Sequence, residues 1–134
     1  MATKQMTMVS RQTIDGETAE QTVRALVAYS VHEHGVVMTY AETGDLEGTA
    51  STLVIKDGEV TLTRNGTTRT TMTFVRGKRC EFSYETAAGL LSMSVVTAAL
   101  DSTLGENGGR LTLRYLLYAG GGFLSKNEMI IDVT

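Results

Sequence analysis

The chain has 134 residues, a net charge of −3 and 14 glycines, with no proline, no tryptophan and one cysteine. Its length fits a single domain over residues 1–134, and 42% hydrophobic against 20% charged residues predict a buried core rather than disorder. This composition excludes collagen, proline-rich linkers, disulfide scaffolds and multidomain enzymes. The negative net charge argues against a nucleic-acid partner.

The N-terminal third of the chain gives two kinds of signal. No apolar run follows Lys4, so no signal peptide is predicted, and no apolar stretch is long enough for a membrane span. We therefore expect a cytoplasmic protein with no membrane partner. Asp15-Gly16 predicts a first reversal of the chain. The segment 18–21 then has the form of a helix capping box, with apolar residues at helical spacing up to Gly35, so it reads as helix or strand.

The rest of the chain reads as short strands separated by tight turns. Segments rich in threonine, β-branched and aromatic residues alternate with Asn-Gly, Asp-Gly and multiple-glycine turns. The segment 90–100 is ambiguous between helix and strand. Counting both ambiguous segments gives about ten strands, and a meander of that length removes its exposed edges by closing on itself. The clear strands are expected at 36–43, 52–56, 59–64, 68–76, 79–86, 110–118 and 128–133.

An ordered set of short motifs also carries a resemblance. It includes Tyr40-Ala41-Glu42, Arg64-Asn65-Gly66, the run 82–86, Gly109-Arg110-Leu111 and Ser125-Lys126-Asn127. The set resembles the YwiB-like family of uncharacterised bacterial proteins and spans about residues 22 to 133. The resemblance implies an all-β fold, a single antiparallel up-and-down barrel of eight to ten strands of the calycin-like or lipocalin-like type, with strand at both ambiguous segments. It implies no reaction.

One departure from the family pattern lies between strands. The family commonly has a proline and an aromatic residue where this chain has Ala87-Ala88. Whatever the aromatic residue contributes at that end of the barrel is therefore in doubt here.

Side-chain alternation places an acid and a base on the apolar face of two strands. Glu42 continues the Val36, Met38, Tyr40 series, and Arg64 continues that of the strand at 59–64. In an up-and-down barrel both strand ends lie at one rim, about 9–10 Å apart, which is twice the strand spacing. We predict a ligand site there, with Arg64 as anion anchor, Glu42 orienting it, and further residues Tyr40, Tyr84, Tyr115 and Asn127.

Two readings of this rim remain open. Arg64 and Glu42 could bind a small, partly apolar or anionic ligand, because arginine presents a planar fork of donors to carboxylate or phosphate. They could instead only neutralise each other and close one end of the barrel. The leading function is therefore a non-catalytic, small-molecule-binding barrel. The alternative is a barrel filled by side chains that acts as a protein-interaction or homodimer module. An enzyme ranks third, because fold alone supports no activity.

No cofactor and no metal are predicted. His32-Glu33-His34 lies beside a turn, and the pattern places no third ligand near it. Cys80 sits in a strand and is read as a small hydrophobic residue. The basic run 76–79 is read as a solvated turn.

Overall fold

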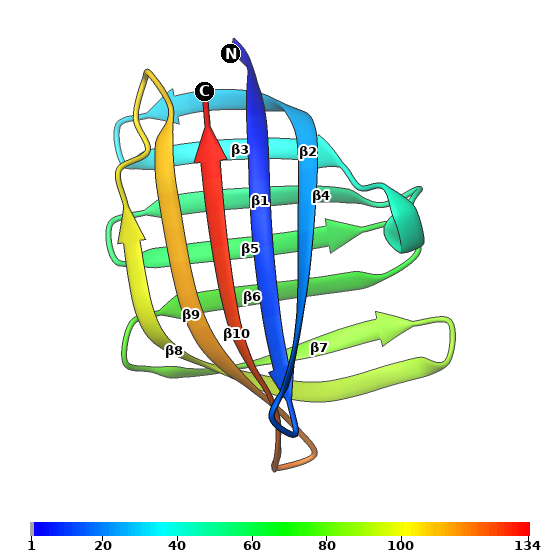
Figure 1. The fold of residues 1–134 in the computed structure, drawn as a ribbon. Coiled ribbons are helices and arrows are strands. Elements are labelled where there is room, and N and C mark those ends of the chain that lie inside the picture. Colours follow the sequence, from blue (N-terminus) through cyan, green and yellow to red (C-terminus); the bar gives the residue numbers. More distant parts are fainter. Residues whose placement is uncertain (1) are drawn as a thin grey trace.

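The computed structural model describes residues 2–134 and forms a closed barrel of ten antiparallel strands (Figure 1). Each strand pairs with its neighbours along the chain, and β1 pairs with β10 to close the barrel. This confirms the all-β barrel, at the upper end of the predicted strand number. The strands are β1 (Ala2–Ile14), β2 (Glu17–His32), β3 (Gly35–Ala41), β4 (Ala50–Lys56), β5 (Glu59–Asn65), β6 (Arg69–Val75), β7 (Arg79–Thr86), β8 (Gly89–Ser102), β9 (Gly109–Ala119) and β10 (Gly122–Val133).

Both ambiguous segments are strands. Residues 17–32 form β2 and residues 89–102 form β8, so the helical interpretation of the capping-box segment is wrong. In β2, Val27 and Tyr29 are buried, while Val23 and Ala25 pack against the same core. Because these residues alternate with a period of two, a strand buries all four, and pairing with β1 along its length satisfies the backbone.

The strands cross in two directions (Figure 1). β1, β9 and β10 lie vertically at the front of the view, and β3 to β7 lie across behind them. The long strands β2 and β8 bend from one direction to the other, as corner strands do in orthogonal packing. β8 also changes register between Thr97 and Ala99, where a bulge allows the bend. The core between the layers is fully apolar at its centre, with Met38, Leu53, Val60, Phe74, Leu111 and Leu113 excluded from solvent.

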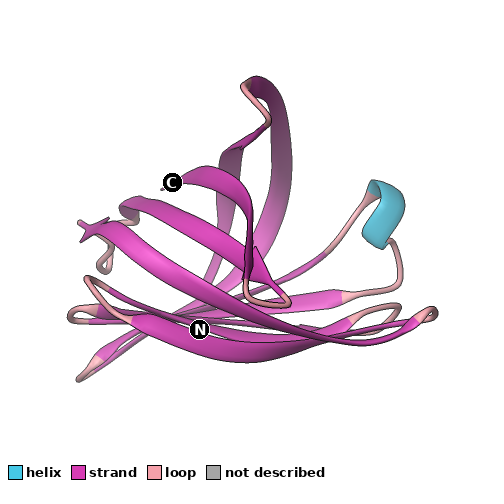
Figure 2. Cartoon of the chain, turned by 90° about the horizontal axis from the view of Figure 1, so that it is seen from below, coloured by secondary structure: helices cyan, strands magenta, loops and turns pink. Residues whose placement is uncertain are grey.

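Short turns connect the strands, with one exception. Between β3 and β4 the chain forms η1 (Gly44–Leu46), a single 3-10 turn that stands to one side of the barrel when seen from below (Figure 2). Glu42 N donates to Thr49 O at 2.8 Å across this connection, which extends the β3–β4 pairing past the end of β3. Glu42 therefore continues the alternating side-chain directions of β3, although it lies outside the strand.

The wall of the barrel is weakest between β6 and β7. These strands pair only at Arg69↔Glu85 and Thr70↔Tyr84, and the Thr70 hydroxyl donates to Ser83 O at 2.9 Å. At the other end of β6, Arg76 forms a bridge with Thr97 of β8 instead. Side chains rather than ladder hydrogen bonds therefore fill the wall between these two points.

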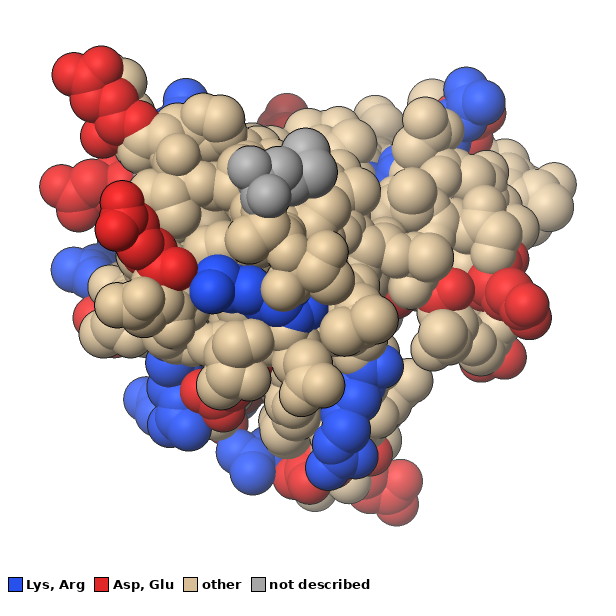
Figure 3. Space-filling model, turned by 90° about the horizontal axis from the view of Figure 1, so that it is seen from above, with Lys and Arg blue, Asp and Glu red and all other residues tan. Residues whose placement is uncertain are grey.

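Charged side chains of both signs are interspersed on the face seen from above (Figure 3). Residues 76–78 of the basic run connect β6 to β7, and Arg79 begins β7. Arg79 lies over the ring of Tyr118, with 4.4 Å between its guanidinium carbon and the ring centroid, and donates to Ser94 Oγ. Among residues 2–134, no helix is long and apolar enough to cross a membrane.

Candidate functional site

An acid and a base meet at the end of β3 and β5. Arg64 Nε lies 3.5 Å from Glu42 Oε2, and Ser51, the cross-strand partner of Arg64, donates its hydroxyl to the same oxygen at 2.6 Å. The side chains are 20% and 9% exposed, so the pair is largely withdrawn from water. Neighbouring charges attract more strongly where water is excluded, so burial strengthens the attraction between Arg64 and Glu42.

Tyr40 supports this pair from the core. It is the cross-strand partner of Ser51 and lies two residues before Glu42, on the same face of the strand. Burial raises the pKa of the Tyr40 hydroxyl well above its ordinary value, and the negative charge of Glu42 raises it further. Arg64 and Ser51 act in the opposite direction and do not cancel this shift. Tyr40 is therefore a neutral hydroxyl beside the Glu42 carboxylate at any physiological pH.

Arg64 also lines a cavity of about 380 Å³ in the lower half of the barrel. Its Nε is fully buried and has no hydrogen-bond acceptor among the described residues, since the Glu42 contact is an ion pair without hydrogen-bond geometry. A buried donor without an acceptor is costly unless a ligand or water satisfies it. Arg64 thus brings one positive charge to the cavity from a rigid strand.

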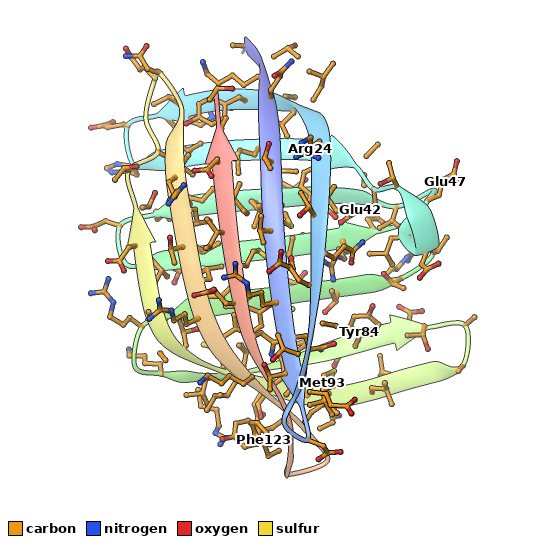
Figure 4. The ribbon with its side chains drawn as sticks, in the orientation of Figure 1. Arg24, Glu42, Glu47, Tyr84, Met93 and Phe123 are labelled. Atoms are coloured by element: carbon orange, nitrogen blue, oxygen red, sulfur yellow. The ribbon has the colours of Figure 1, made fainter. Side chains whose placement is uncertain are left out.

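Most of the cavity wall is apolar. Leu91 and Leu124 stand at its edge, with 54% and 40% of their surface exposed. Figure 4 labels Tyr84 and Met93, two of the lining residues, in the lower half of the barrel below Glu42. The apolar lining residues are Leu62, Met72, Phe82, Leu91, Met93, Leu117, Leu124 and Met129.

Besides Arg64, the polar residues of the wall come from four strands. Tyr115 of β9 packs edge-on against Phe74, with 4.9 Å between ring centroids, and burial raises the pKa of its hydroxyl although the Arg64 charge opposes this. Asn127 of β10 is the cross-strand partner of Tyr115. Tyr84 of β7 and Gln12 of β1 complete the polar set. The cavity therefore combines a cation, two phenols and two amides with an apolar body, the composition of a small-molecule site.

Depressions of similar size occur elsewhere, but their arginines form ion pairs with acidic residues. At the opposite end of the barrel, one of about 380 Å³ contains Arg76 and Asp101, which pair with each other at 3.4 Å, and Arg76 also donates to Leu100 O. An outer groove contains Arg11 and Arg114, which form ion pairs with Glu128 at 2.6 Å and 2.9 Å, respectively. Their remaining cations, Lys56 and Lys126, are exposed, whereas Arg64 is largely withdrawn from water, so the Arg64 cavity is the strongest candidate.

Four predicted site residues line the same cavity: Arg64, Tyr84, Tyr115 and Asn127. The two others lie behind Arg64. Tyr40 was expected to form a wall but is 4% exposed and does not reach the cavity, because β3 directs its ring into the core. Glu42 contacts Arg64 and not the cavity.

Sequence reasoning missed several lining residues. Gln12 continues the inward series Met6, Met8 and Ser10 of β1, so alternation was the signal that could have found it. Leu124 follows no such rule, because the register of β10 shifts between Phe123 and Ser125. A bulge of this kind changes which face a residue takes and leaves no reliable mark in the sequence.

The other candidate motifs make no site. His34 is exposed and lies 4.0 Å from Glu33, and His32 contacts Ser30 of its own strand. Within residues 2–134, no group of three or more His, Cys, Asp and Glu side chains could hold a metal ion. Cys80 is half-buried and packs against the core, as its strand position predicted.

Comparison with known proteins agrees with this fold. The chain is 27% identical over 106 residues to the uncharacterized β-barrel protein YwiB of Bacillus subtilis (strain 168). The aligned residues cover 79% of this chain and 75% of that protein. It superposes on the crystal structure of that protein from Bacillus subtilis with a TM-score of 0.89 and 24% identity, over 98% of this chain and 89% of the other. Residues 6–131 match the family described as a domain of unknown function, DUF1934. The chain, a ten-stranded barrel of the YwiB-like type, belongs to this family.

Proposed function

We propose that the protein is a non-catalytic binding protein for a small, partly apolar, anionic ligand held in the cavity beside Arg64. One observation carries the proposal: the guanidinium of Arg64 lines a mostly apolar cavity, and none of its N–H groups donates a hydrogen bond to a described residue. Glu42 holds the guanidinium from behind, so that little conformational entropy is lost when an anion binds.

The chemistry of the lining supports binding rather than catalysis. Arg64, Tyr84 and Tyr115 are its titratable side chains. The raised pKa of Tyr115 keeps its hydroxyl neutral near pH 7. General acid–base catalysis needs a group that exchanges protons near the working pH, and the described lining contains no carboxylate, histidine, cysteine or lysine to serve as one.

Native mass spectrometry of gently purified protein tests the proposal. We expect wild type to retain a bound species that is released on denaturation, and Arg64→Gln to lose it. Arg64→Lys keeps the charge and should retain part of the occupancy. The control is Arg24→Gln, which should bind as wild type does. Arg24 is an exposed residue of β2 and is labelled in Figure 4 above the cavity. Equal occupancy in wild type and a folded Arg64→Gln variant would refute the proposal.

A second function is favoured by the exposed apolar residues at the same end. Leu90 and Phe123 are 67% and 58% exposed and do not line the cavity. Apolar side chains left in solvent at one end of a molecule favour association, so a homodimer through these turns is the second candidate. Sedimentation of wild type and of a Leu90→Ser, Phe123→Ser double variant tests it. A dimer that becomes a monomer in the variant supports this function, and a monomeric wild type excludes it.

A further inference from the structure

The polar groups of the cavity differ in what they offer a ligand. This inference rests on the proposed function and concerns the class of ligand. The Arg64 guanidinium offers only donors, because it carries N–H groups and no acceptor. It is the only side chain with a fixed charge among the described residues that line the cavity.

The amides on β1 and β10 offer acceptors instead. Asn127 donates through Nδ2 to Ser125 Oγ at 2.9 Å and to Ser125 O at 3.3 Å, and Gln12 Nε2 lies 3.5 Å from the same hydroxyl. These contacts use the amide N–H groups within the protein. The carbonyl oxygen of Asn127 receives no hydrogen bond from a described residue, although the side chain is only 7% exposed. This oxygen still reaches solvent, so it can accept a hydrogen bond from a ligand donor or from water.

Apolar surface separates the donor group from the acceptor group. Arg64 and Asn127 lie on β5 and β10, which are opposite strands of the closed barrel, and Tyr115 is the cross-strand partner of Asn127. Leucine and methionine side chains make up most of the remaining wall. A volume of about 380 Å³ holds about a dozen non-hydrogen atoms, at the roughly 30 Å³ that a water molecule occupies in the liquid.

We propose that the ligand is a monocarboxylic acid of about a dozen non-hydrogen atoms, with an apolar skeleton and one hydroxyl or N–H donor at the end remote from the carboxylate. The carboxylate pairs with Arg64, and the donor reaches the Asn127 carbonyl oxygen. A carboxylate fits better than a phosphate dianion because the cavity supplies one positive charge, and Glu42 beside it repels a second negative charge.

Isothermal titration calorimetry with four probes tests this class. The probes are phenylpropionate, its para-hydroxy derivative, the alcohol that corresponds to the para-hydroxy acid, and the phosphate monoester of that alcohol. We expect the para-hydroxy acid to bind wild type about fivefold more tightly than phenylpropionate, the worth of one neutral hydrogen bond. It should bind at least about tenfold more tightly than the alcohol, which lacks the charge.

Variants assign the preference to residues. Asn127→Leu should reduce the para-hydroxy preference to within about twofold while phenylpropionate still binds. Gln12 is an exposed residue of β1, and Gln12→Met should keep most of the preference even if Asn127→Leu proves unstable. Arg64→Lys should keep the para-hydroxy preference, since the amide side of the cavity is unchanged.

The outcomes separate this inference from the proposed function. Equal affinity for the two acids, a preference that survives in Asn127→Leu, or tighter binding of the phosphate ester overturns the ligand class. Arg64-dependent binding in any of these cases leaves the proposed function intact. If no probe binds but native mass spectrometry finds an Arg64-dependent species, the ligand class alone is wrong. If no binding depends on Arg64, both are wrong.

Discussion

At the scale of residues, the site depends on how Arg64 divides its contacts. One edge of its guanidinium faces Glu42 at 3.5 Å, and the side chain also lines the cavity. Glu42 therefore has two opposing effects. It fixes the arginine in place, and its negative charge lowers the attraction of the site for an anion.

Replacement of Glu42 by glutamine separates these two effects. We expect Glu42→Gln to lower the free energy of unfolding by about 1–2 kcal/mol, because a largely buried arginine loses its counter-charge. The same variant should bind a carboxylate probe about threefold more tightly or better, because a nearby negative charge is gone. Urea unfolding and calorimetry measure both quantities. Glu47→Gln, an exposed residue after η1, is the control. Weaker anion binding with unchanged stability would contradict this division of roles.

The buried tyrosines make stability depend on alkaline pH. In the folded protein the pKa of Tyr40 is raised above its ordinary value of 10.0 by burial and by Glu42. Below pH 10 both the folded and the unfolded state hold this proton, so the stability is fully present. Above pH 10 the unfolded chain releases the proton first, and stability falls as pH rises toward the folded pKa.

Urea unfolding at a series of pH values from neutral to alkaline measures this dependence. The free energy of unfolding of wild type should decrease above pH 10, with Tyr40 contributing up to about 1.4 kcal/mol per pH unit. Tyr29 and Tyr115 add to the decrease, since burial raises the pKa of each. Tyr40→Phe should show a shallower slope. Identical slopes for wild type and variant would mean that Tyr40 ionises as readily in the folded state as in the unfolded chain.

At the scale of elements, the β5–β6 turn positions Arg64 by its contact with the β3–β4 connection. Thr49 receives a hydrogen bond from Thr67 N at 3.1 Å, and the two threonine hydroxyls lie 2.8 Å apart. Gly66 makes the approach possible. A Cβ added there would lie 2.4 Å from Gly48 O and 2.5 Å from Thr49 Cα, so only glycine fits without movement of the backbone.

Alanine at this position tests the role of the turn. Gly66→Ala should lower the free energy of unfolding by about 2 kcal/mol or more, because backbone must move to relieve the clash. The control is Gly58→Ala in the β4–β5 turn, where φ is also positive at +74° but a Cβ would meet nothing within 4 Å. That variant should lose only about 1 kcal/mol from backbone strain. A smaller loss for Gly66→Ala than for Gly58→Ala in urea unfolding would contradict the proposed contact.

At the scale of the whole molecule, the barrel was predictable because many weak signals agree. Alternation in segments such as 36–42 and 110–117, together with Asn-Gly and Asp-Gly turns, predicts an antiparallel meander. Alternation also placed Glu42 and Arg64 on one face, and the structure brings them into contact. The long strand β2 was ambiguous from its sequence, because its first residues resemble a helix cap. Pairing with β1 decides for strand, and that pairing is a tertiary contact that the local sequence does not show.

The cavity itself was less predictable than its polar residues. Its shape depends on the weak β6–β7 pairing and on the β10 bulge, which expose Met72, Phe82 and Leu124 to one space. Neither feature follows from periodicity, since both are departures from it. Tyr40 shows what alternation cannot predict. Alternation correctly places its side chain inside the barrel, but it does not distinguish a core position from a cavity wall.

The affinity of wild type and Arg64→Gln for phenylpropionate, measured by titration calorimetry, tests the central claim most directly. Loss of the guanidinium should weaken binding by about tenfold or more, the worth of a charge-assisted pair, while Arg64→Lys loses less and Arg24→Gln loses nothing. Circular dichroism of each variant verifies that the barrel is folded. Equal affinity of wild type and folded Arg64→Gln would contradict the account, because the cavity would then bind the acid without its anion anchor.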